Sequence, residues 1–151
     1  MANDFDREVG SVGVWAKRCY LAGRALMEEM LRPHGLGATQ WYVLHQLATV
    51  GPTMQRDLVR LLQVERATMS IIIAALVRKG LVEQVPDEVD QRQKLLLLTR
   101  AGKTLWGKLP DLGGIRDVAF GDLSNADIQT TVRVLRTATE RLHQRLKGNL
   151  R

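Results

Sequence analysis

Hydrogen-bonding side chains are concentrated at the start of an apolar-periodic segment near the middle of this 151-residue chain. Arg66, Thr68 and Ser70 occupy alternate positions there. All three can bond to base edges or phosphate oxygens, and the fork of an arginine matches O6 and N7 of guanine. The alternative is that Thr68 and Ser70 are ordinary solvated residues of a helix surface. These residue types therefore offer the chemistry of nucleic-acid recognition.

Further basic residues flank this segment, namely Arg56, Arg60, Arg78 and Lys79. Cations of this kind bind phosphates, which orients a protein on a duplex without reading its sequence. The alternative for each of them is a solvated basic surface. The whole chain has 22 Lys and Arg against 16 Asp and Glu, a net charge of +6, and this excess favours a polyanionic partner.

Apolar periodicity predicts the elements that must position these side chains. An amphipathic helix is expected over residues 12–30, where apolar residues recur every three or four positions, and the proline in the 32–35 segment ends it. A second helix is expected to begin at an N-cap Thr39 and to close at Gly51 and Pro52.

Two short helices joined by a tight turn are expected next. Thr53 is the expected cap of a helix over residues 55–62, with Leu58, Leu61 and Leu62 facing inward. Another helix covers residues 65–79 and ends at Gly80, where glycine suits a left-handed C-cap. This spacing is typical of a helix-turn-helix.

The remaining elements complete a mainly α fold with a small antiparallel β wing. Residues 81–85 and 95–98 are expected to be the two strands of the wing, around a charged loop at 86–94. Thr99 is the expected cap of a helix that runs through residue 109, and Pro110 with the glycines at 113–114 marks a break. Ser124 opens a last helix whose apolar residues have heptad-like spacing.

This order of elements resembles the MarR family of bacterial regulators over nearly the whole chain. The resemblance rests on runs at 76–82 (LVRKGLV), at 87–92 in the wing, and at 98–102 (LTRAG). It implies one domain over 1–151, with a winged helix-turn-helix at 36–100 and dimerisation helices at 8–34 and 103–148. It further implies a homodimer that binds a palindromic operator in double-stranded DNA, as a repressor released by a small aromatic carboxylate or phenol.

The resemblance also assigns roles in the wing loop. It implies that Arg92 enters the minor groove and that Asp90 orients it. A narrow minor groove concentrates negative potential, and a guanidinium is less strongly hydrated than an ammonium. Gln91 stands where the family usually has a basic residue, so Lys94 is expected to share the charge. The alternative is a salt-bridged surface loop.

The recognition helix departs from the family at two positions. Ala67 and Ile71 stand where polar side chains are frequent in the family. An isoleucine at this position is expected either to touch a thymine methyl group or to be buried, so no base contact is assigned to it.

The family's ligand pocket is expected between the first two helices and the fifth. Trp15 and Arg18 share one helix face, and Trp41 and His45 share another, because they are three and four residues apart. An aromatic slot with one cation is what an aromatic carboxylate needs. The alternative is that these side chains are plain core residues.

The chain lacks the sequence signatures of most other classes of protein. Cys19 is the single cysteine, which leaves a redox-sensing regulator as an alternative, although a structural cysteine is favoured. No cofactor, metal or enzymatic activity is expected, because the sequence has no phosphate-binding loop, nucleophile elbow or metal-ligand spacing.

No apolar run has membrane-spanning length and residues 1–8 are not signal-like, so a cytoplasmic protein is expected. A helical dimerisation protein that binds no DNA is the remaining alternative.

Overall fold

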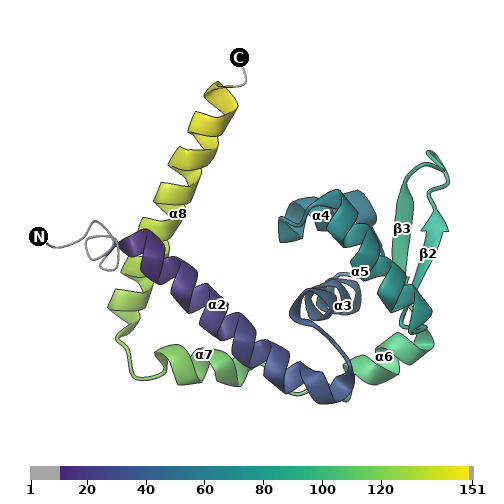
Figure 1. Ribbon diagram of the computed structural model, residues 1–151, viewed down its shortest axis with the longest axis horizontal. Coiled ribbons are helices and arrows are strands. Elements are labelled where there is room, and N and C mark those ends of the chain that lie inside the picture. The colour runs from purple at the N-terminus through teal and green to yellow at the C-terminus, as the bar shows by residue number, and fades with distance from the viewer. Residues whose placement is uncertain (1–10, 150–151) are drawn as a thin grey trace, which may run out of the picture. The chain divides into compact units, whose positions relative to one another are not determined.

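The computed structural model describes residues 11–149, which form two compact units (Figure 1). The first unit ends at Asp111 and the second begins at Leu112. Residues 8–10 of the expected N-terminal dimerisation helix, and the N-terminal segment 1–8, lie outside the described residues. The elements are α2 (Val12–Leu31), η1 (Arg32–His34), α3 (Ala38–Thr49), β1 (Thr53–Met54), α4 (Gln55–Leu62), α5 (Arg66–Arg78), β2 (Val82–Pro86), β3 (Lys94–Leu98), α6 (Arg100–Trp106), α7 (Gly113–Phe120) and α8 (Asn125–Gly148).

Helix α3 is the centre of the first unit. Figure 1 shows it end-on, and it contacts α2, α5, α6 and β3. Apolar side chains from the surrounding elements close over it, which is the burial that stabilises a domain of this size. The buried apolar residues are Met27, Leu31, Leu36, Ala38, Val43, Leu44, Leu47, Leu58, Met69, Ile73, Leu76, Leu81, Val82 and Leu96.

The expected two-stranded wing is part of a three-stranded antiparallel sheet. The strand order is β1-β3-β2, so β3 lies in the middle. Leu96 of β3 is paired with Thr53 on one side and with Gln84 on the other, and its side chain is buried. The short strand β1 therefore ties the start of the helix-turn-helix to the wing.

The expected cap of α3 was wrong. The helix begins two residues earlier than predicted, with Gly37 as its N-cap and Thr39 inside the first turn. A carboxylate oxygen of Glu28 accepts a hydrogen bond from the Ala38 N–H at 3.0 Å, and the Gln40 side chain accepts one from the Gly37 N–H at 3.2 Å. These two acceptors satisfy N–H groups at the start of the helix, so α3 begins without a side-chain cap from Thr39.

Two expectations for α4 were also wrong. Its N-cap is Met54, and Thr53 lies in β1, where its hydroxyl donates to the Gly51 carbonyl at 2.9 Å. Thr53, which was expected to cap α4, is instead paired with Leu96 in the sheet. Leu58 is buried and Leu62 half-buried as predicted, but Leu61 is 59% exposed.

The start of α6 explains why a threonine and a glycine occur three residues apart there. Thr99 caps the helix as predicted, since its hydroxyl accepts from the Gly102 N–H at 3.0 Å. The same hydroxyl donates to the Gly80 carbonyl at 2.6 Å, and the Thr99 N–H donates to the Leu81 carbonyl at 3.1 Å. Gly102 is buried so closely against this junction that a Cβ would collide with the Leu81 carbonyl oxygen and would lie 2.7 Å from Leu98 Cδ1.

In the second unit, Ser124 caps α8 as predicted, because its hydroxyl accepts from the Asp127 N–H at 3.1 Å. Gly113 and Gly114 were expected to belong to a break, but they are the first two residues of α7, a short helix that the sequence did not predict. No side chain among residues 112–149 is buried in the structure of the single chain. Over residues 11–149, no helix combines the length and the apolar character needed to cross a membrane.

We expect Gly102→Ala to destabilise the fold by about 1–3 kcal/mol, because the added methyl group has backbone on one side and must displace it. Gly107→Ala, at the other end of α6, is the matched control, since an added Cβ there meets only ordinary contacts at 3.6 and 3.8 Å. Urea denaturation at equal protein concentration measures both. Equal midpoints for the two variants would contradict the tight junction.

Candidate nucleic-acid interface

Helices α4 and α5 form a helix-turn-helix. Only residues 63–65 separate them, and Gln63 in this turn has a left-handed backbone with φ of 51°. That conformation is uncommon for a residue other than glycine and reverses the chain within a few residues. Leu58 of α4 and Met69 of α5 are both buried on the inner side of the pair. The outer surfaces of both helices are therefore left exposed.

The two arginines of α4 lie on this exposed side. Arg56 Nε is 3.9 Å and Arg60 is 3.8 Å from the same Asp57 carboxylate oxygen, and the arginine side chains are 56% and 78% exposed. Exposed pairs of this kind contribute only about 0–1 kcal/mol. Both guanidinium groups can therefore exchange this partner for a phosphate.

The three polar residues predicted at the start of α5 are all exposed. Ser70 is not independent of its neighbours, because its hydroxyl donates to the Arg66 carbonyl at 3.0 Å. It also accepts from the Gln55 side chain at 3.5 Å, and Gln55 in turn accepts from the Gln84 side chain at 2.6 Å. Gln55 and Gln84 thus join α4, α5 and β2 on one surface. Neither residue was predicted, because a single sequence carries no signal for a side-chain relay between distant elements.

In the wing loop, Asp90 contacts both the backbone and the side chain of Arg92. An Asp90 carboxylate oxygen accepts from the Arg92 backbone N–H at 3.1 Å and lies 3.6 Å from Arg92 Nε. Asp90 is itself fixed, because its own N–H donates to Asp87 at 3.1 Å and its carbonyl accepts from the Gln93 N–H at 2.8 Å. The Arg92 side chain is 95% exposed. Lys94 lies at the start of β3, opposite Pro86.

The two basic residues at the end of α5 have different surroundings. Arg78 is the last helical residue and is exposed. Lys79, which was expected to bind phosphate, instead donates to the Gly35 carbonyl and, at 3.1 Å, to the Gln40 side chain. It therefore anchors the end of α5 to the turn between α2 and α3, because its ammonium reaches two oxygens that the chain itself supplies.

Trp41 and His45 form part of an aromatic cluster. Their rings are stacked with centroids 4.9 Å apart, and Trp106 of α6 lies 5.4 Å from Trp41 and 5.7 Å from His45. Trp106 was not among the predicted ligand-binding residues, although the fifth helix was expected to border the pocket. The cluster has surfaces for stacking and an imidazole that can donate a hydrogen bond.

Trp15 and Arg18 form a second pair, on α2. The Arg18 guanidinium lies over the Trp15 ring, 5.3 Å from its centroid. Both side chains are exposed, as is Cys19 beside them. Arg24, whose guanidinium contacts Thr39 at 3.0 Å, marks where α2 meets α3, and Arg18 lies about 9 Å along the helix axis from it. The four predicted ligand-binding residues therefore form two separate pairs in the single chain.

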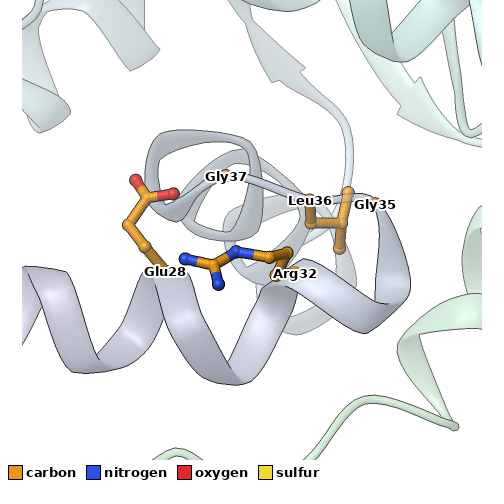
Figure 2. A pocket seen from close by; sticks show the side chains of 5 residues that line it. All are labelled: Glu28, Arg32, Gly35, Leu36 and Gly37. Atoms are coloured by element: carbon orange, nitrogen blue, oxygen red, sulfur yellow. The ribbon is translucent and has the colours of Figure 1, made fainter.

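A shallow hollow of about 310 Å³ lies where α2 turns into α3 (Figure 2). Its lining residues are Glu28, Arg32, Gly35, Leu36 and Gly37. Glu28 is already engaged as the acceptor for α3 and lies 3.5 Å from Arg24, so the hollow belongs to the junction between these helices. Among residues 11–149, no three His, Cys, Asp or Glu side chains are grouped to hold a metal ion.

Known proteins share this fold and these motifs. The family model described as MarR family matches residues 34–93. The transcriptional activatory protein BadR of Rhodopseudomonas palustris is 36% identical over 106 residues, which are 67% of this chain, and the match spans 61% of that protein's length.

Two solved structures are similar over most of the chain. A cysteine-to-serine mutant of MarR from E. coli, complexed with operator DNA, has a TM-score of 0.79 at 23% identity and covers 90% of this chain and 99% of its own. BpsR of Bordetella bronchiseptica, whose DNA binding is regulated by 6-hydroxynicotinic acid, has a TM-score of 0.76 at 26% identity, with 87% and 94% covered.

The fold and the exposed basic surface define a winged helix-turn-helix protein, as the sequence predicted. The chain belongs to the MarR family of transcriptional regulators, which is a non-enzymatic family.

Proposed function

We propose that this protein is a sequence-specific regulator that binds a palindromic operator in double-stranded DNA as a homodimer. The observation that carries the proposal is Arg92, an almost fully exposed arginine held by Asp90 on a wing beside an exposed helix-turn-helix. The relative from E. coli was solved on operator DNA with the same fold. Such a protein acts in the cytoplasm, where operator DNA lies, and we propose repression as the outcome of binding.

The basic and polar residues divide the work of recognition in this proposal. Arg66, Thr68 and Ser70 enter the major groove, since the first turns of a recognition helix contact base edges. Arg92 enters the minor groove with Asp90 as its support, and Lys94 adds charge behind it. Phosphates are bound by Arg56, Arg60 and Arg78, which lie exposed on the same two helices.

We expect the wild-type chain to shift duplex DNA from the promoter region of its own gene at lower concentration than an unrelated duplex. Arg92→Ala weakens binding about 10- to 150-fold per half-site, the value of one lost charge-assisted hydrogen bond. Arg60→Ala weakens binding to all sequences alike and lowers the slope of log K against log salt by about 0.9 per half-site. Electrophoretic mobility shift across a salt series measures both.

The control for this test is Arg141→Ala, on α8 in the second unit. Its salt slope should equal that of the wild type. An unchanged affinity in Arg92→Ala together with an unchanged slope in Arg60→Ala would contradict the proposed interface.

Apolar surface on α2 and α8 supports the homodimer. The stripe predicted on the first helix is not covered within the chain, since Val12 is 63% and Trp15 55% exposed. On α8, Leu142 is 66% and Leu146 62% exposed, and the two residues are one turn apart. Uncovered apolar area of this extent is typical of an interaction surface. We propose that a second copy of the chain covers both stripes.

We expect the wild-type chain to sediment at twice its mass of 17.0 kDa at micromolar concentration. The double variant Leu142→Glu and Leu146→Glu shifts the protein to monomer, because the carboxylates cannot be buried unpaired. Val89→Glu, at a wing position that is 95% exposed, leaves the dimer unchanged. A wild-type monomer, or a double variant as dimeric as the control, would contradict the interface.

We propose that a small aromatic carboxylate or phenol releases the protein from DNA. BpsR, a relative with this fold, is regulated by 6-hydroxynicotinic acid, a compound of that class. The cluster of Trp41, His45 and Trp106 offers stacking surfaces, and Arg18 over Trp15 offers the cation. Because the two groups are separate in the single chain, each is tested by its own variant.

We expect Arg18→Ala to weaken binding of salicylate or 6-hydroxynicotinate about 10- to 150-fold, through loss of a charge-assisted hydrogen bond. Trp106→Ala removes an aromatic contact of about 0.5–1.5 kcal/mol, which is about 2- to 13-fold. Calorimetry with and without operator DNA measures both, and linkage requires DNA to weaken ligand binding by the factor with which ligand weakens DNA binding.

Two results would count against this effector site. Ligand affinity equal to wild type in Arg18→Ala would show that Arg18 is not the anchor. A collapse of operator affinity in the ligand-free Arg18→Ala variant would assign Arg18 to the dimer structure instead. Arg141→Ala is again the matched arginine control.

A further inference from the structure

We infer that Ile71 is a specificity-determining residue that reads the methyl group of thymine in the operator. The inference deepens the proposed function, because it requires that α5 enter the major groove. It concerns a position for which the sequence left two possibilities open, a methyl contact or a buried side chain. The Ile71 side chain is 70% exposed, which excludes burial in the core of the chain.

The helix geometry places Ile71 at the outer centre of α5. Met69 and Ile73 are buried at 0% and 1% exposure, and Ile71 lies two residues from each. At about 100° per residue, a separation of two residues points a side chain about 160° away from both. Ile71 therefore faces directly away from the core that fixes α5.

The residues that share this outer face are small apart from one arginine. Ala67 and Thr68 precede Ile71 by about one turn, and Ala74 and Arg78 follow it by one and two turns, all exposed. With alanine on either side, the isoleucine is the most projecting side chain in the centre of this face. The first two turns of a recognition helix are the part that reaches base edges, and Ile71 is within them.

Ser70, the polar residue that directly precedes Ile71, lies to one side of this face. Ser70 is occupied by the Arg66 carbonyl and by Gln55, so its hydroxyl is held toward α4. An apolar side chain that faces base edges gains nothing from the donors and acceptors there, and it leaves them without partners. The thymine methyl is the apolar group that the major groove presents, and apolar side chains contact it. A thymine opposite Ile71 in each half-site is therefore the favoured base.

The experiment uses the full-length protein and a duplex library with a random core, from which the wild type selects its preferred sites. Each thymine of a selected site is then replaced singly by deoxyuridine, which removes only the methyl group. Loss of one buried methyl weakens binding about fourfold, and symmetrical loss in two half-sites about 15-fold. Mobility shift at fixed salt measures the ratio of the two affinities for each position.

The protein variants identify the residue that senses the methyl group. We expect Ile71→Ala to bind the thymine and deoxyuridine duplexes equally, and Ile71→Val to retain part of the difference. Val50→Ala is the control, because Val50 is 71% exposed at the end of α3 and outside α5. It should keep the full difference. Since Ile71 is exposed, its truncation leaves the fold intact.

The outcomes separate the inference from the proposed function. A wild type that selects no sequence contradicts the proposed function itself. A wild type that selects sites but is indifferent to every thymine methyl overturns the inference and leaves the proposed function standing. A thymine preference that persists in Ile71→Ala also overturns it, because another residue then reads the methyl group.

Discussion

Packing of one face of α5 against the core around α3 is the interaction on which the rest of the structure depends. Met69, Ile73 and Leu76 are fully or almost fully buried in that contact. Because a helix is rigid, fixing this face also fixes the rotation of every other side chain on α5. The outward position of Ile71 is thus decided by its buried neighbours. A protein that reads DNA needs such an element, since base contacts tolerate little displacement.

The wing is held to the same core by a second set of contacts. Leu96 is buried in the central strand, and its strand pairs with β1 just before α4 begins. Thr99 links the end of β3 to Gly80, the residue that follows α5 and has a φ of 72°. The recognition helix and the wing therefore meet at shared backbone positions. This arrangement sets the separation between Arg92 and the surface of α5, which must match the spacing of two DNA grooves in the proposed complex.

The sequence predicted most helices and both long strands because their apolar residues have clear periods. It failed where a local signal was overridden by a distant contact. Thr39 and Thr53 are good capping residues, but Glu28 and strand pairing replaced them. Lys79 was expected to bind phosphate, but its ammonium donates to oxygens of residues 35 and 40. These residues are far from Lys79 in the sequence, so no pattern in the sequence indicated the contacts. Side-chain relays such as Gln84 to Gln55 have no signature at all in a single sequence.

The basic residues differ in what they contact, and this difference bears on which of them are available to DNA. Lys79 donates to two oxygens of the chain, so a phosphate would have to replace both. Arg56 and Arg60 share a single exposed carboxylate at 3.8–3.9 Å, and an exposed pair contributes so little that a duplex phosphate displaces it readily. Arg92 is intermediate, because Asp90 also accepts from its backbone N–H. In the proposed complex, Asp90 can thus keep the loop in shape while the guanidinium leaves it for a groove, so we propose that this acid supports Arg92 rather than competes for it.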